Sequence, residues 1–358
     1  MNWGELITLE YGKPVKDKES TDGKVPVYGT NGQIGTSHLP AQCKHPSFIL
    51  GRKGAYRGVH YSDCPFSVID TAFYAEPLTD RIDLKWAYYK FLTYDINGMD
   101  SGSAIPSTDR YQIYSIEVEV PPLEKQRKIV AVLDCIDRKI NINQKVNDNL
   151  EQQAAALFSS LYNRSNTEVR YTDLIQILGG GTPKTGETAY WNGNIAFFTP
   201  KDVGTPYTFI TEKTITEEGL SHCNSRLYPV NTVFVTARGT VGKVGLSGVP
   251  MAMNQSCYAL VGKETHQLLV YFYTLKAVDR LKHKASGAVF DAITTRDFDS
   301  EQIMKLSDDD AKAFLCVAEP MFQEVLNNSI ENLRLSTLRD FLLPKLMSGE
   351  IDVSSVQL

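Results

Sequence analysis

Cysteine is scarce in this sequence, and no two cysteines lie close together along the chain. Zinc sites and the disulfide frameworks of small secreted domains usually take their sulfur ligands from closely spaced positions. The six cysteines are Cys43, Cys64, Cys135, Cys223, Cys257 and Cys316. Their spacing favours neither a disulfide framework nor a zinc site, and we expect no bound metal and no cofactor.

Long hydrophobic runs are also missing. The longest apolar runs fall well short of the ~18 residues that a membrane-spanning helix requires, and Met1–Glu5 has neither the basic nor the apolar region of a signal peptide. The remaining composition, 42% hydrophobic and 22% charged over 358 residues, is typical of a globular protein of two or three domains. We therefore expect a cytoplasmic protein that does not associate with membranes.

The sequence has no excess of positive charge. Its net charge of -5 argues against a protein that coats nucleic acid along its whole surface. Affinity for DNA depends on how many phosphates are neutralised locally, so a focused basic patch is compatible with an acidic remainder. The charge balance favours a subunit of a larger assembly, in which partner chains supply part of the positive surface.

Catalytic motifs are lacking as well. The sequence contains no Asn-Pro-Pro-Tyr segment of the kind used in adenine methylation and no convincing glycine loop for a methyl donor. The glycine clusters at 179–186 and 238–245 fail the phosphate-loop spacing, in which Gly-Lys-Ser/Thr closes a fixed interval before a helix. Asn254–Cys257 offers a thiol, but the sequence places no histidine to activate it. We expect a noncatalytic protein.

What the sequence does contain is one series of elements that occurs twice. Gly102–Pro106 leads into a strand-like run, Ser115–Val120, and then into a helix, and Gly287–Asp291 begins the same series 185 residues later. Self-similarity at a fixed period determines the architecture. We predict an α+β fold with a pseudo-two-fold internal repeat. Two globular β-rich domains of the same type, residues 1–120 and 166–307, alternate with helical segments at 121–165 and 308–358.

Both helical segments carry a coiled-coil seam, with apolar residues at alternating spacings of four and three. The first seam comprises Ile129, Leu133, Ile136, Ile140, Asn143, Asn147, Leu150, Ala154, Leu157 and Leu161. The second comprises Phe314, Ala318, Met321, Val325, Asn328, Asn332, Leu335, Arg339, Leu342 and Leu346. An asparagine in such a seam usually fixes the register, because its amide needs a partner. The alternative is that these asparagines face solvent on ordinary amphipathic helices.

The two helices are expected to pair antiparallel. Each has ~39 residues and would be about 58 Å long, so a parallel pair would need the intervening domain to carry the chain all that way back. An antiparallel pair needs no such return and would place the two domains at opposite ends of a rod. In that register Asn143 faces Asn332, and Asn147 faces Asn328.

The helical segments and the starts of the domains resemble one known family. Pro121–Ile140 resembles the first conserved region of the specificity subunit of Type I restriction-modification systems, and Leu338–Ile351 looks like its closing segment. Four further stretches are similar to common openings of its target recognition domains: Val25–Gly32, Gly180–Lys184, Tyr190–Ile195 and Thr199–Val203. The order of these motifs, together with the duplication, covers the whole chain.

This resemblance implies a noncatalytic subunit of a phage-defence system. Such a subunit reads a bipartite DNA site with its two recognition domains, and it docks two methyltransferase subunits on paired spacer helices. In the restricting complex it also binds motor-nuclease subunits. The assembly would be an adenine-DNA methyltransferase and an ATP-dependent endonuclease. The two domains here differ greatly in sequence, so the two half-sites are expected to differ.

DNA contacts are expected on polar loops, because Arg, Lys, Asn, Ser and Tyr match phosphates and base edges. Gly51–Gly58 is such a loop, and Thr236–Lys243 is the corresponding one. Arg52 and Arg238 lie 186 residues apart and so take corresponding places. For each residue the alternative is an ordinary hairpin, turn or cap. The candidate DNA-contacting residues are Arg52, Lys53, Tyr56, Arg57, Ser103, Ser107, Arg110, Lys201, Arg238, Lys243, Asn254 and Arg296.

Apolar side chains outside the first seam indicate a docking surface for a methyltransferase subunit. They are Val132, Ile142, Val146 and Phe158. Packing against the chain's own recognition domains is the equal alternative. Two other readings remain for the whole protein. One is a scaffold whose paired heads bind proteins rather than DNA. The other is a methyltransferase fragment, against which the missing catalytic motif argues.

Overall fold

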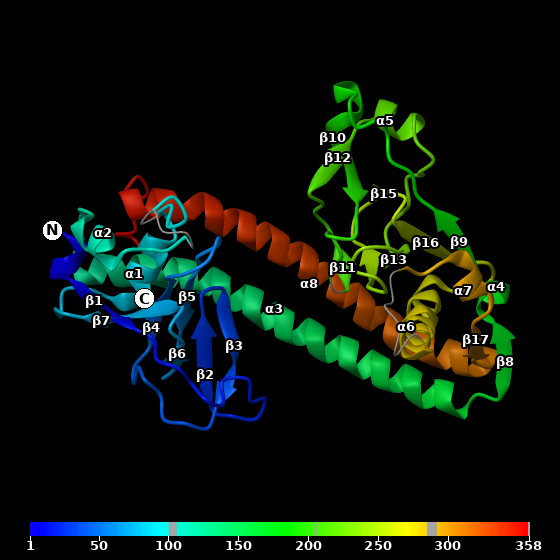
Figure 1. Ribbon diagram of the computed structural model, residues 1–358, viewed down its shortest axis with the longest axis horizontal. Coiled ribbons are helices and arrows are strands. Elements are labelled where there is room, and N and C mark those ends of the chain that lie inside the picture. The colour runs from blue at the N-terminus through cyan, green and yellow to red at the C-terminus, as the bar shows by residue number, and fades with distance from the viewer. Residues whose placement is uncertain (100–105, 205, 285–291, 357–358) are drawn as a thin grey trace. The chain divides into compact units, whose positions relative to one another are not determined.

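The computed structural model describes the chain except for residues 100–105, 205, 285–291 and 357–358. It divides into two compact units, one formed by Met1–Asn141 with Leu333–Leu358 and the other by Ile142–Asn332. Two helices, α3 (Leu123–Arg164) and α8 (Asp308–Ser348), each contribute to both units (Figure 1). No helix in the described parts of the chain combines the length and apolar character needed to cross a membrane.

The first unit contains two sheets. One has the order β1-β7-β4-β5, with β1 (Ile7–Tyr11), β4 (Ser47–Gly51), β5 (Val59–Ser62) and β7 (Ala72–Pro77) paired antiparallel. The smaller sheet has the order β3-β2-β6, from β2 (Val25–Gly29), β3 (Gly32–Ser37) and β6 (Ser67–Val68). Strand β4 is buried along its whole length, as expected for an apolar strand with neighbours on both sides. The helices are a 3-10 turn at Trp3–Glu5, α1 (Leu84–Phe91) and α2 (Arg110–Ser115).

The second unit repeats this plan. Its main sheet has the order β11-β14-β13-β16-β9, and α6 (Gln267–Lys284) packs against it (Figure 1). The strands are β9 (Ile175–Gly179), β11 (Tyr207–Thr208), β13 (Val233–Thr236), β14 (Val244–Ser247) and β16 (Cys257–Gly262). A second sheet joins β10 (Trp191–Phe198), β12 (Lys213–Ile215) and β15 (Met251–Met253), and β8 (Thr167–Arg170) pairs with β17 (Gln302–Lys305). Short helices are α4 (Tyr171–Leu174), α5 (Glu217–Ser221), α7 (Thr295–Asp299) and a 3-10 turn at Thr188–Tyr190.

The repeat holds at the level of single backbone contacts. Strand β1 pairs with β7 from Ile7 opposite Pro77, and β9 pairs with β16 from Ile175 opposite Gly262, which lies 185 residues beyond Pro77. Each unit also has a parallel pair in its smaller sheet, β2 with β6 and β10 with β15. The predicted α+β fold with an internal repeat is confirmed. The Gly102–Pro106 and Gly287–Asp291 motifs lie almost entirely outside the described residues.

The seam asparagines meet as the antiparallel register predicts. Asn143 Nδ2 donates to Asn332 Oδ1 at 2.9 Å, and Asn328 Nδ2 donates to Asn147 Oδ1 at 3.0 Å. Asn147 Nδ2 in turn donates to Ser329 Oγ at 3.2 Å. Asn143, Asn147 and Asn328 are buried. The predicted pairing is confirmed, and the alternative of solvent-facing asparagines is wrong.

Farther along α8, in the first unit, the seam contains a charge in place of an apolar side chain. Arg339 Nη1 lies 3.0 Å from Asp137 Oδ1 on α3, and the Tyr89 hydroxyl on α1 donates to Asp137 Oδ2 at 2.7 Å. Burial, together with this bond to a carboxylate, raises the pKa of Tyr89 well above its usual range. Asp137 therefore joins both long helices to α1.

We predict that Asn147→Ala lowers the stability of the second unit by about 1–3 kcal/mol, because the Asn328 amide is left buried without its partner. The double variant Asn147→Leu/Asn328→Leu removes both amides and should lose less. Urea unfolding followed by circular dichroism measures both effects. Asn149→Ala, at an exposed position on the same helix, serves as the control. A single variant as stable as this control would contradict the role of the amide pair.

Candidate nucleic-acid interface

The loop after the central strand has the same backbone frame in both units. In the first, the amides of Arg52 and Lys53 both donate to Thr71 O. In the second, the amides of Ala237 and Arg238 both donate to Ser256 O, and each of these three residues lies 185 positions beyond its counterpart. The bridge from Lys53 to Ser107 likewise recurs as a bridge from Arg238 to Ala292.

This frame corrects the proposed equivalence of Arg52 and Arg238. Arg238 corresponds to Lys53, and Arg52 corresponds to Ala237, because sequence spacing alone left the alignment one residue out. The turn that follows needs a left-handed backbone in both loops. Gly54 has φ +119° and Gly239 has φ +80°, a region that glycine enters without strain.

In the first unit, two arginines stack on one tyrosine. The guanidinium carbons of Arg52 and Arg110 lie 5.0 and 4.9 Å from the ring centroid of Tyr11, which is partly exposed at the end of β1. Arg110 is the first residue of α2, whose N-cap is Asp109, and its Nη2 lies 3.4 Å from the exposed Tyr111 hydroxyl. Neither arginine has a carboxylate ion pair within the described residues. Guanidinium groups held on an aromatic face in this way keep their edges available for an anion such as phosphate.

The second unit has none of this cluster at the matching places. Gly179, Ala237 and Thr295 occupy the positions of Tyr11, Arg52 and Arg110. Its cations come from other positions on the same frame. Arg238 and Lys243 on the loop and Arg296 on α7 are exposed, and none of them has an ion pair within the parts of the chain that the structure describes. The two units therefore present different cations on one scaffold.

The other candidates have varied surroundings. Tyr56 is exposed, Lys53 lies 3.9 Å from Asp70, and Ser107 is half-buried. Lys201, 3.4 Å from Glu212, and Asn254 were proposed separately, and they line one cavity of about 330 Å³ in the second unit. Ser103 lies outside the described residues.

Arg57 is a correction to the candidate set. Its side chain is buried, and its Nη2 donates to the carbonyl oxygens of Ile96 at 3.2 Å and Asn97 at 2.7 Å. Its backbone amide donates to Asn97 Oδ1 at 2.7 Å. This guanidinium is directed into the protein and holds the 96–97 turn against the loop, so it is not available to DNA. The sequence could not separate it from Arg52, because both lie in one polar loop.

Tyr11 and Tyr111 were missed by the sequence reasoning. Both rings lie within 5.2 Å of the Arg110 guanidinium, but Tyr11 comes about a hundred positions earlier in the chain than Arg110. The only available signal was an aromatic residue beside each arginine candidate in space, which requires the fold.

The proposed docking residues of α3 also separate. Phe158 is buried, with its ring stacked 5.0 Å from Phe272 and in edge contact with Phe314 at 5.4 Å, so it belongs to the core and is not a docking residue. Val132 is partly buried against the core of the first unit. Ile142 is 57% and Val146 40% exposed, one helical turn apart.

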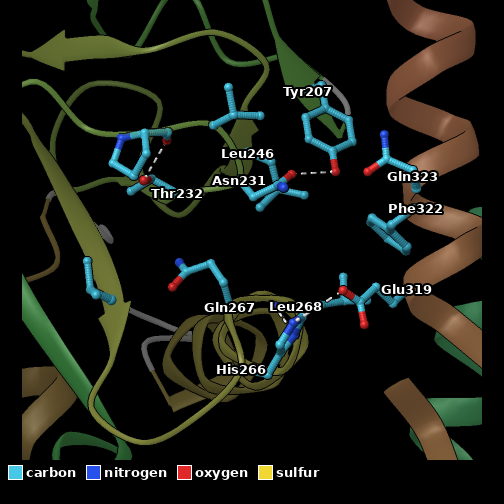
Figure 2. A pocket seen from close by; sticks show the side chains of 13 residues that line it. Tyr207, Asn231, Thr232, Leu246, His266, Gln267, Leu268, Glu319, Phe322 and Gln323 are labelled. Carbon is cyan, nitrogen blue, oxygen red and sulfur yellow. Dashed lines mark hydrogen bonds and ion pairs between the residues drawn. The ribbon is translucent and has the colours of Figure 1, made fainter. Parts of the chain in front are cut away.

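A further cavity of about 430 Å³ lies in the second unit between its main sheet and α8 (Figure 2). The Tyr207 hydroxyl donates to Asn231 Oδ1 at 2.8 Å on one side, and His266 Nε2 lies 3.6 Å from Glu319 on the other. The lining contains no arginine or lysine. It therefore lacks the cations that a phosphate backbone requires.

Comparison with known proteins gives one family. Residues 2–152 and 163–305 match the model of the Type I restriction modification DNA specificity domain. The chain is 23% identical over 346 residues to the Type I restriction enzyme HindI specificity subunit of Haemophilus influenzae, an alignment that covers 74% of each chain. It is 32% identical over 124 residues to the MjaIX specificity subunit of Methanocaldococcus jannaschii, covering 33% of this chain and 29% of that one.

The fold is similar to a crystal structure of the S subunit of a Type-I restriction-modification system from M. genitalium. The TM-score is 0.62 at 16% sequence identity, with 97% of this chain and 95% of that chain covered.

We predict that Arg57→Met destabilises the first unit by about 1–3 kcal/mol, because two carbonyls lose their buried donor. Arg52→Ala should change the melting temperature much less, because the Arg52 guanidinium is not part of such a buried bond. Differential scanning calorimetry distinguishes the two variants. Equal melting temperatures for them would contradict the structural role assigned to Arg57.

Proposed function

This chain belongs to the Type I restriction modification DNA specificity family, and on that premise we propose that its two units read the two different halves of a split DNA site. It is a DNA sequence-recognition subunit and, like specificity subunits generally, is noncatalytic. The alternative of a scaffold with protein-binding heads is not favoured by its relatives. We assign recognition to residues 1–120 and 166–307, and spacing of the half-sites to the helical segments 121–165 and 308–358.

The observation that carries this proposal is the different set of cations on one repeated frame. Arg52 and Arg110 on Tyr11 serve the first domain, while Arg238, Lys243 and Arg296 serve the second. A shared frame presents its loop to DNA in the same way, and different side chains on it select different bases. Lys53, Tyr56, Ser107, Lys201 and Asn254 are secondary contacts in this proposal.

The assembled complex supplies the chemistry. We assign double-stranded DNA and two methyltransferase subunits as partners, joined in the restricting form by motor-nuclease subunits. Adenine methylation and ATP-dependent cleavage then belong to those partners. The exposed pair Ile142 and Val146 on α3 is the proposed contact for one methyltransferase subunit, because exposed apolar neighbours on one helix face suit a protein interface.

Recognition is tested with the complex assembled from this chain and its methyltransferase, on a DNA library with each half randomised. We expect Arg52→Ala to relax or weaken recognition of one half and Arg238→Ala to affect the other. Loss of a base contact costs about 1–3 kcal/mol at one position, whereas loss of a phosphate contact lowers the salt slope by ~0.9 for all sequences. Arg164→Ala, an exposed arginine at the end of α3, is the control. If both variants affect the same half, the two-domain assignment is wrong.

Docking is tested with the double variant Ile142→Asp/Val146→Asp, which places two charges in the proposed contact. We expect it to lower the yield of the methyltransferase complex at least about tenfold in size-exclusion chromatography, since a buried unpaired charge is costly. Gln144→Asp, also exposed on α3, should assemble normally. An unchanged yield for the double variant would place the methyltransferase contact elsewhere.

A further inference from the structure

Three side chains with metal-binding atoms meet in the first unit. Cys43 lies in a short bridge with Phe66, His45 follows two residues later, and Glu76 extends from β7. Cys43 Sγ is 3.8 Å from His45 Nε2, and His45 Nε2 is 2.7 Å from Glu76 Oε2. The three ligand atoms all lie within 4.8 Å of one another.

The histidine is held in the orientation that a metal ligand needs. Its other ring nitrogen, Nδ1, lies 3.0 Å from the carbonyl oxygen of Pro46. A carbonyl only accepts hydrogen bonds, so Nδ1 is the donor in this contact. A neutral ring then has its lone pair on Nε2, directed toward the thiol and the carboxylate. Metal-bound histidines are usually fixed by a bond of this kind from the second nitrogen.

The fold itself does not require these residues. In the second unit the bridge of Cys43 with Phe66 recurs as Tyr228 with Met251, and the pairing of Thr8 with Glu76 recurs as Gln176 with Val261. By the same alignment Val230 takes the place of His45. Two of the three positions are therefore valine in the copy, where they serve packing alone.

We propose that Cys43, His45 and Glu76 bind one divalent transition-metal ion, with zinc as the best match. Thiolate, imidazole and carboxylate together are a zinc donor set, whereas magnesium and calcium prefer oxygen ligands alone. Tetrahedral zinc would set the sulfur and nitrogen about 3.5 Å apart and the nitrogen and oxygen about 3.4 Å apart. The first distance is nearly met. The second requires the carboxylate to withdraw by about 0.7 Å, which its partly exposed position on the sheet allows.

The site would connect the segment before β4 to β7. Cys43 is fully buried, while the His45 and Glu76 side chains are 38% and 34% exposed, so the fourth position faces solvent and takes water. Because metal bound only in the folded state stabilises that state, zinc should raise the melting temperature of the first unit.

The test uses Co(II) as a spectroscopic probe on the full chain after removal of metal with a chelator. We expect one equivalent of Co(II) to give a thiolate-to-cobalt charge-transfer band and the visible bands of a four-coordinate ion, both removed by one equivalent of Zn(II). Cys43→Ser should abolish the charge-transfer band, and His45→Gln should weaken Co(II) binding at least about tenfold. Cys64→Ser, an exposed thiol of the same unit, and Cys257→Ser, a buried thiol of the other unit, should keep the band.

Glu76→Gln gives an independent measurement at a partly exposed position if Cys43→Ser fails to fold. It should fold normally, bind Co(II) more weakly than the unchanged chain, and lose the rise in melting temperature that Zn(II) produces. The proposal is overturned if the unchanged chain gives no charge-transfer band, if the band survives in Cys43→Ser, or if it disappears in Cys64→Ser. It is equally overturned if Glu76→Gln responds to Zn(II) as fully as the unchanged chain does.

Discussion

The amides of Asn147 and Asn328 can satisfy each other in only one register of α3 against α8. Shifting either helix by one turn would bring an apolar residue opposite each amide and leave a buried donor without an acceptor, at a cost of about 1–3 kcal/mol per group. Leucines and valines on either side would tolerate such a shift, because apolar contacts are not directional. The antiparallel pairing of the second unit therefore depends on this polar layer, which gives up some apolar burial for a fixed alignment.

A repeated backbone allows the two domains to differ in what they bind. The loop after β4 and the loop after β13 are held by main-chain hydrogen bonds to Thr71 and Ser256, and these bonds do not depend on which side chains the loops carry. Arg52 can thus be matched by alanine, and Lys53 by arginine, without a change of frame. A stable scaffold with exchangeable side chains suits a family whose members recognise different DNA sequences.

The corrections share a physical origin. Arg57 and Arg52 lie in one loop, yet one guanidinium donates to buried carbonyls while the other stacks on an exposed tyrosine. Phe158 follows the helical pattern of a surface residue but meets Phe272 from α6 in the core. In the same way, Glu76 is too far along the chain from Cys43 for ligand spacing to show their meeting. In each case the deciding neighbour comes from a distant part of the sequence.

The sequence by itself determined the duplication, the two long helices, their antiparallel register and the family. These follow from periodic patterns, namely the 185-residue repeat and the heptad spacing with its paired asparagines, and periodic patterns persist in one dimension. Only the tertiary structure decided which loop arginine is exposed, which residue of one unit matches which of the other, and that Tyr11 joins Arg52 to Arg110. Side-chain direction and long-range contact depend on how strands pair and where turns fall, and a shift of one residue reverses the face on which a side chain lies.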